Sequence, residues 1–255
     1  MIIRPFDAGF FLLMAVMIGA IVLLWALLRG RSEQRREAVL IALCVVNIIG
    51  FFVYKGFLSG DAQFLQVSGL DKFNWFNELP LQLCNINMFL IPIGVLTRRR
   101  SLLGFAFFVA PLGALMALVF PEAAFSGHSL WTPRIFGFYF THMLIIICGL
   151  SLATLGFYRP RPKDLPGIAG TFLMLGFSAL LVDLLLRHTV CPQANYFFVF
   201  GQDVDISILN LFWKWFPVPL LYELPALAIL FVYMGLVCLV FSKLDARRAR
   251  RAAAG

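Results

Sequence analysis

The chain has 255 residues, of which 61% are hydrophobic and 13% are charged, and its mean hydropathy is +0.89. A soluble domain averages about 25% charged residues, so this composition excludes a protein whose whole surface meets water. The net charge of +8 does not indicate nucleic-acid binding, because the cations are concentrated in short segments between apolar blocks.

The apolar blocks have the length that a helix needs to cross a hydrocarbon core. Backbone polar groups cannot stay unpaired in lipid, and the blocks are continuously apolar rather than alternating, so we expect helices and not a β-barrel. The sequence therefore predicts an all-α polytopic membrane protein with seven transmembrane helices, at Phe10–Leu28, Ala38–Phe57, Leu79–Leu96, Leu102–Phe120, Ile135–Phe157, Leu165–Leu186 and Pro219–Phe241.

Prolines and aromatic residues add detail to these predicted spans. Pro92, Pro111 and Pro225 lie inside them and predict kinks, while the aromatic segment Phe212–Phe216 predicts a helix at the membrane interface. We expect a single membrane domain over residues 1–245, followed by a basic cytoplasmic tail at residues 246–255.

Most of the 21 Lys and Arg residues follow the odd-numbered spans. Because short cytoplasmic loops carry the excess of Lys and Arg, this distribution predicts an amino terminus outside and a carboxyl terminus in the cytoplasm. The residues that set this orientation are Arg29, Arg31, Arg35, Arg36, Arg98, Arg99, Arg100, Arg159, Arg161, Lys163, Lys243, Arg247, Arg248, Arg250 and Arg251.

Polar residues inside the spans are functional candidates, because a strongly polar side chain in lipid is energetically costly. At about 1.5 Å per helical residue, Cys84 lies about 8 Å and His142 about 11 Å below the outer ends of their spans. We therefore expect a polar cavity in the outer half of the membrane. Its further candidates are Gln82, Asn85, Tyr139, Asp183, Tyr222 and Glu223.

Cys84 and His142 are the residue types that nucleophilic acyl chemistry requires. A thiolate attacks an ester, and a neighbouring imidazole takes the thiol proton. The amides of Gln82, Asn85 and Asn195 are candidate donors to the developing oxyanion. No metal site is expected, because the three histidines lie far apart in the sequence and lack metal-ligand spacing.

Structural explanations compete with this chemistry. Asp183 and Arg187 are four residues apart and could form a helix-surface ion pair. Gln82 and Asn85 could join helices by hydrogen bonds. A disulfide between Cys84 and Cys191 would consume the nucleophile.

Three sequence segments, together with seven predicted spans, resemble the YwaF/TMEM164 family of integral membrane proteins. They are LPLQLC at Leu79–Cys84, the stretch Phe138–His142, and the NYFF segment at Asn195–Phe198. The resemblance implies an acyltransferase that moves acyl chains between phospholipids and lysophospholipids, with Cys84 as nucleophile and His142 as base. Gln82 stands where many members are expected to carry a histidine. The architecture is also similar to that of AIG1-like membrane hydrolases of lipid esters.

We accordingly expect a lipid acyltransferase in the outer half of the membrane, with membrane phospholipids as partners and no cofactor. The compact chain, rich in Arg and Ala, predicts the cell membrane of a bacterium. Two alternatives stay open at this point: a lipid hydrolase of the same Cys/His type, and a non-enzymatic ligand-binding or transport protein with an outward-facing polar cavity.

Overall fold

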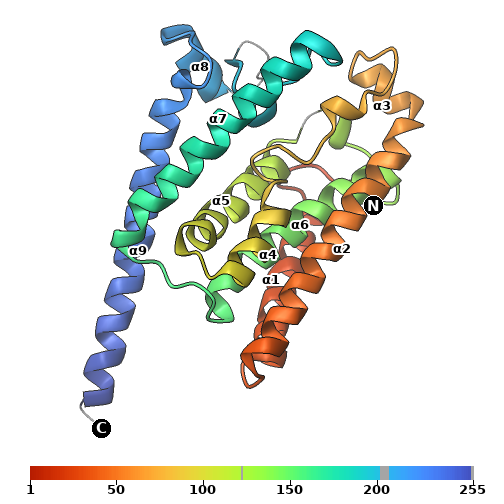
Figure 1. Cartoon of the computed structure of the whole chain (residues 1–255). Helices are drawn as coiled ribbons and strands as arrows, with labels where there is room; N and C mark the ends of the chain where they lie inside the picture. Colours follow the sequence, from red (N-terminus) through yellow and green to blue (C-terminus); the bar gives the residue numbers. More distant parts are fainter. Residues whose placement is uncertain (122, 202–206, 254–255) are drawn as a thin grey trace.

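The computed structural model describes the whole chain except residues 122, 202–206 and 254–255 (Figure 1). The described residues form helices joined by turns and short 3-10 segments, which confirms the all-α class. The α-helices are α1 (Ala8–Leu28), α2 (Glu33–Ser59), α3 (Ala62–Val67), α4 (Asn87–Thr97), α5 (Arg100–Val119), α6 (Pro133–Thr154), α7 (Leu165–Thr189), α8 (Ser207–Trp215) and α9 (Leu224–Ala253).

Within the described residues, six helices are long and apolar enough to cross a membrane: α1, α2, α5, α6, α7 and α9. The protein is therefore an integral membrane protein. The aromatic segment expected to form a helix does so in α8, with Phe212 buried and Trp215 exposed. One prediction was wrong: Pro225 lies in the first turn of α9 instead of kinking it, because α9 begins only at Leu224. The same helix continues to Ala253, through most of the expected basic tail.

The third predicted span, Leu79–Leu96, is helical only from Asn87, where the 11-residue α4 begins. Residues 79–86 form turns because a distant loop supplies their hydrogen-bond partners. The Leu79 N–H donates to the Tyr196 hydroxyl, 3.0 Å away, and the Gln82 amide binds the loop backbone. Irregular backbone at membrane depth is tolerated where protein buries it.

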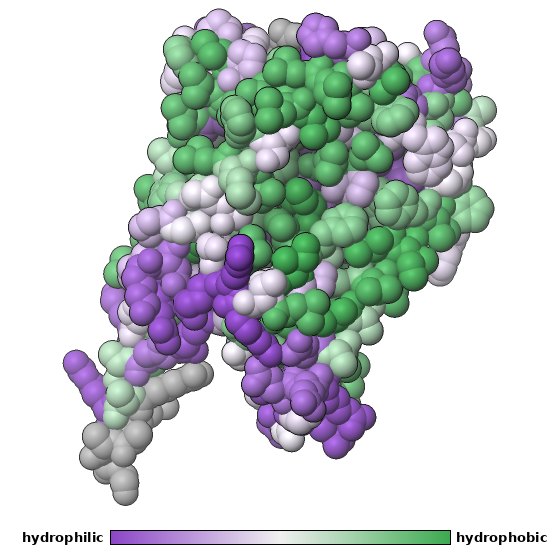
Figure 2. Space-filling view, viewed as in Figure 1, coloured by the Kyte–Doolittle hydropathy of each residue, from purple (hydrophilic) through white to green (hydrophobic). Residues whose placement is uncertain are grey.

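Ion pairs join the basic segments at one end of the molecule, where hydrophilic residues also gather in Figure 2. Arg98 contacts Glu33 and Glu37 at 2.9 and 2.6 Å, Arg100 contacts Asp164 at 2.5 Å, and Arg159 pairs with Asp245. The segments that follow α1, α4 and α6 therefore share one end with the carboxyl-terminal part of α9. This arrangement is the one that the alternation of Lys and Arg along the sequence requires.

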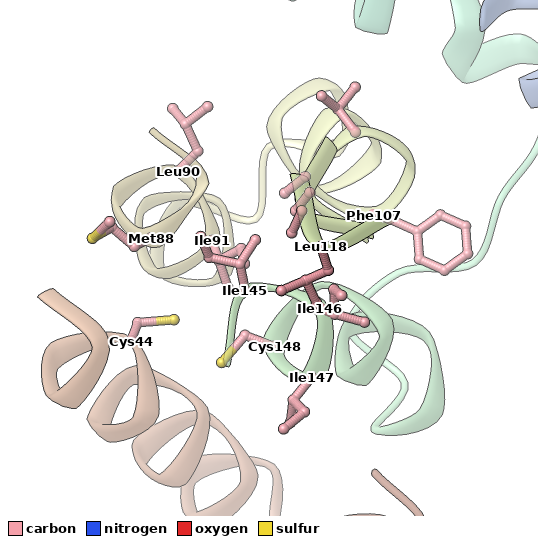
Figure 3. Packing of buried hydrophobic residues seen from close by; sticks show 14 of the residues in the cluster. Cys44, Met88, Leu90, Ile91, Phe107, Leu118, Ile145, Ile146, Ile147 and Cys148 are labelled. Carbon is pink, nitrogen blue, oxygen red and sulfur yellow. The ribbon is translucent and has the colours of Figure 1, made fainter. Parts of the chain in front are cut away.

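Close contacts between α2 and α6 hold the centre of the bundle together. A Cβ at Gly137 would lie 2.2 Å from Tyr54 Cβ, and one at Gly50 would lie 2.7 Å from the Phe140 ring. Small residues of this kind let membrane helices approach closely. Deeper along the same contact, Cys44 and Cys148 face each other across the two helices in a dry apolar layer (Figure 3).

Figure 1 shows α4, α5 and α6 in the middle of the molecule, with α1 and α2 on one side and α7 and α9 on the other. α6 is the most deeply buried of the candidate spans, because 72% of its apolar 18-residue stretch lies inside the protein. Because α6 carries His142, that histidine belongs to the best-shielded helix of the bundle, and it is 5% exposed.

Candidate functional site

The structure brings Cys84 and His142 together. The Cys84 Sγ lies 3.7 Å from His142 Nε2, although 58 residues separate the two in the sequence. On the other side of the ring, His142 Nδ1 lies 2.8 Å from the carbonyl oxygen of Phe138. A carbonyl can only accept, so Nδ1 carries the proton in this contact, and Nε2 presents its lone pair to the thiol. A neutral imidazole held in this way is arranged to act as a base.

The turn segment 79–86 explains how the thiol reaches the histidine. A turn carries Cys84 against α5, where a Cβ on Gly113 would lie 3.6 Å from Cys84 Cβ. Cys84 is partly exposed, whereas Cys44, Cys148, Cys191 and Cys238 are buried. Cys84 is therefore the most exposed of the five cysteines.

A buried ion pair beside the two residues was missed in the sequence. Lys55 of α2 pairs with Glu78, and their side chains are 8% and 15% exposed. Glu78 immediately precedes the segment that carries Cys84, so this ion pair joins the start of that segment to α2. The sequence did carry a signal, because Lys55 lies inside the second predicted span, where a charged residue is a functional candidate.

Gln82 and Asn195 are engaged with the backbone of the loop after α7. Gln82 Nε2 donates to the Asn195 carbonyl at 3.2 Å, and its Oε1 accepts from the Phe197 N–H at 3.2 Å. The Asn195 amide makes the same double contact with the backbone of Phe200, at 2.8 and 2.9 Å. Each amide nitrogen donates one of its two N–H groups to the loop and each amide oxygen accepts from it, so both side chains are fixed to the loop and the structure favours a structural role for both.

Asp183 and Tyr222 also bind this loop. Asp183 is fully buried and its Oδ1 accepts from the Tyr196 N–H at 2.9 Å, while the Tyr222 hydroxyl donates to the Phe198 carbonyl. Arg187 contributes a hydrogen bond of 2.7 Å to the Ala194 carbonyl. The residues expected to line one polar cavity thus divide into a hydrogen-bonded loop support and the Cys84–His142 pair.

The remaining candidates lie apart from the loop. Asn85 follows Cys84 directly and is 9% exposed, and its Oδ1 has no hydrogen-bond partner among the described residues. Tyr139 faces α1 instead of Cys84, and lines an apolar cleft of about 210 Å³ together with Leu13 and Met143. Its phenol is 1% exposed and likewise lacks a partner within the described part of the chain.

The proposed bridge between Cys84 and Cys191 does not form. Both residues are free thiols, and the Cys191 Sγ lies 4.0 Å from Asn77 Oδ1 in a buried position. Burial raises the pKa of the Cys191 thiol above its usual value. Cys191 is therefore an inert packing residue, and the Cys84 thiol remains available.

The fold and this site define a polytopic α-helical membrane protein with a cysteine–histidine pair held between α4, α5 and α6. Residues 6–241 match the profile of the TMEM164 family, so the chain belongs to that family, and the resemblance seen in the sequence is confirmed. No curated protein and no solved structure gives a significant match.

Proposed function

We propose that this protein is a membrane-embedded acyltransferase that moves a fatty acyl chain from a phospholipid to a lysophospholipid through a thioester on Cys84. The observation that carries the proposal is the contact of 3.7 Å between Cys84 Sγ and the unprotonated Nε2 of a histidine whose other nitrogen is fixed by a backbone carbonyl. Membership of the TMEM164 family supports it, through the acyltransferase character that the resemblance implies.

The first half of the reaction forms the thioester. His142 Nε2 takes the Cys84 thiol proton as the sulfur attacks the carbonyl carbon of a phospholipid ester. The tetrahedral intermediate then collapses, its carbon–oxygen bond to glycerol breaks, and the imidazolium returns the proton to the leaving oxygen. A lysophospholipid departs and the acyl chain stays on the sulfur.

The second half reverses these roles. The hydroxyl of an acceptor lysophospholipid gives its proton to His142 Nε2 and attacks the thioester carbonyl. The carbon–sulfur bond breaks, and the sulfur takes back the proton from the imidazolium, which restores the starting state. If water replaces the lysophospholipid, the same residues hydrolyse the ester, which is the runner-up function.

Backbone groups are suited to stabilise the oxyanion in both halves. The proposed donors are the N–H groups of Cys84 and Asn85, which flank the reacting side chain along the backbone. The side chain of Asn85 directly follows Cys84 in the chain, and its Oδ1 has no hydrogen-bond partner among the described residues. Gln82 and Asn195 take no direct part in this scheme.

The proposed topology places the reaction in the outer half of the membrane. We take residues 79–97 as the third of seven crossings, because Glu78 pairs with Lys55 near the end of α2 while Arg98 contacts Glu33 at the start of α2. The basic end is the cytoplasmic one by the distribution of Lys and Arg. The proposed location is the cell membrane of a bacterium, with its phospholipids as substrates.

Acyl transfer between two lipids of different headgroup tests the proposal. Purified protein is reconstituted with an acyl-labelled phospholipid and an unlabelled lysophospholipid, and the product lipids are separated. Wild type should move label to the second headgroup, and Cys84→Ala and His142→Gln should lose at least about 99% of that rate. The matched controls Cys191→Ala and His188→Gln should retain it.

The outcomes separate the candidate functions. Label recovered as free fatty acid assigns the hydrolase, because water is then the acceptor. Full transfer by Cys84→Ala would show that another group carries the acyl chain. A wild-type protein that leaves both lipids unchanged would favour a ligand-binding or transport protein.

A further inference from the structure

Two short helical segments lie against the end of α6 that is opposite to the basic segments. They are α3, which belongs to the loop after α2, and the 3-10 segment Ala123–Phe125, which follows α5 (Figure 1). Asp61 is the N-cap of α3, because its Oδ1 accepts the Phe64 N–H at 2.9 Å. Phe64 is buried although α3 has only six residues, so this helix is packed into the protein instead of lying free on its surface.

A continuous row of aromatic rings runs from α3 to His142. The centre of the Phe64 ring lies 6.0 Å from that of Phe125, and the Phe125 ring stacks on Phe138 of α6 at 4.6 Å with an interplanar angle of 17°. The Phe138 ring in turn lies 4.5 Å from the His142 ring, and all four side chains are buried. The three phenylalanines form an aromatic cap on the side of His142 that faces this end of α6.

Arg134 fastens α3 to α6. It lies in the first turn of α6, and its side chain is 2% exposed. Its Nη1 lies 3.2 Å from Asp61 Oδ2, and its Nη2 donates to Gln63 Oε1 at 3.2 Å. A buried guanidinium is costly unless an opposite charge and hydrogen bonds compensate it, and both partners come from the start of α3. The position of the aromatic cap therefore depends on this ion pair as well as on apolar packing.

We propose that the aromatic cap keeps water away from the Cys84–His142 pair, so that the acyl chain on Cys84 passes to a lysophospholipid instead of to water. Arg134 and Asp61 are positioning residues, because they act through the cap. The inference rests on the proposed function and adds to it the residues that decide between the two acceptors.

The two acceptors compete for the same thioester. If water attacks, its oxygen bonds to the acyl carbon, the carbon–sulfur bond breaks, a fatty acid leaves, and His142 passes the proton from water to sulfur. Closing a site to water prevents this hydrolysis of a reactive intermediate. Cys84 is partly exposed whereas the His142 ring is buried, so a lipid can approach the sulfur while the cap covers the ring.

The ratio of hydrolysis to transfer tests the inference. Protein is reconstituted with an acyl-labelled phospholipid and an unlabelled lysophospholipid of another headgroup, and label is counted in free fatty acid and in the new phospholipid. Phe64→Ala and Phe125→Ala should raise the ratio at least about tenfold, which corresponds to about 1.4 kcal/mol between the two barriers. The matched control is Phe107→Ala, which removes a buried ring that packs against Tyr158 and Phe241 near the basic segments, and it should keep the wild-type ratio.

A permanently charged methanethiosulfonate reagent tests the cap without any lipid substrate. Such a reagent reaches a thiol only through water, and the labelled peptide containing Cys84 is quantified by mass spectrometry. Phe64→Ala and Arg134→Met should label faster than wild type, whereas Phe107→Ala should not. Monodisperse elution in detergent checks the fold of each variant. Phe64→Leu leaves a smaller cavity than Phe64→Ala, so it tests the cap even where Phe64→Ala does not fold, and its labelling rate should exceed that of wild type.

A hydrolysis-to-transfer ratio and a labelling rate that stay at wild-type values in the folded cap variants would overturn the inference, because the three rings would then be ordinary packing. An equal rise in Phe107→Ala would also contradict it, since general loosening of the bundle would explain the result. Failure of the proposed function is distinguishable: wild type would then convert neither lipid, while the labelling of Cys84 would still depend on the cap.

Discussion

Replacing Gln82 by methionine separates a structural amide from an oxyanion donor. The change keeps the length of the side chain but removes the donor to the Asn195 carbonyl and the acceptor of the Phe197 N–H, both at 3.2 Å. A polar group left without its partner in a buried position costs about 1–3 kcal/mol. The two losses together should destabilise the protein by roughly 2–6 kcal/mol.

Thermal unfolding in detergent, followed by circular dichroism, measures this loss for Gln82→Met. The exposed Gln66 of α3 provides the control variant, Gln66→Met, which should unfold as wild type. Loss of an oxyanion donor lowers the rate of an enzyme about 100–1,000-fold. The acyl-transfer rate of Gln82→Met per folded molecule should fall far less than that. An unchanged unfolding midpoint combined with a loss of that size would refute the structural role of Gln82.

Two further predictions concern the helices that hold the site. Gly137→Ala places a Cβ 2.2 Å from Tyr54 Cβ and should cost about 1–3 kcal/mol of stability by overpacking. Gly56→Ala is the control and should be tolerated, because its Cβ meets open space. Equal unfolding midpoints for the two variants would contradict the packing of α2 against α6. Hydrogen bonds from the N–H groups of Phe10 and Arg4 hold the pKa of Asp7, the N-cap of α1, below its usual value. A lowered folded-state pKa stabilises the protein above the unfolded pKa, and this contribution is lost as the pH falls through the folded one. The difference in unfolding midpoint between wild type and Asp7→Ala should therefore be largest at neutral pH and shrink as the pH falls through the lowered pKa of Asp7. A difference that does not depend on pH would argue against the charged cap.

The helices were predictable because span length and apolar composition determine them locally. Six of the seven predicted spans correspond to long helices, and the basic segments meet at one end as their spacing required. The start of α4 was not predictable in this way. The hydrogen bonds that keep residues 79–86 out of the helix come from Asn195, Tyr196 and Phe197, more than 100 residues away.

The proximity of Cys84 and His142 was anticipated from depth and from the family resemblance. The estimate of depth assumed that residues 79–86 are helical, and they are not. The contact between Cys84 and His142 therefore depends on the turns that these residues form. Tyr139 was grouped with His142 by its nearness in sequence, yet it faces α1. Lys55, near the outer end of the second predicted span, was not singled out as a candidate, since nothing local shows that Glu78 folds back onto it.

A thioester on Cys84 is the central intermediate of this account, and its detection tests the account most directly. Purified protein is incubated with phospholipid in the absence of an acceptor, quenched in acid, and the peptide containing Cys84 is analysed by mass spectrometry. The account predicts an added mass of one acyl chain on Cys84 that neutral hydroxylamine removes, and far less of it in His142→Gln. An unmodified Cys84 in protein that transfers acyl chains when the acceptor is added would contradict it.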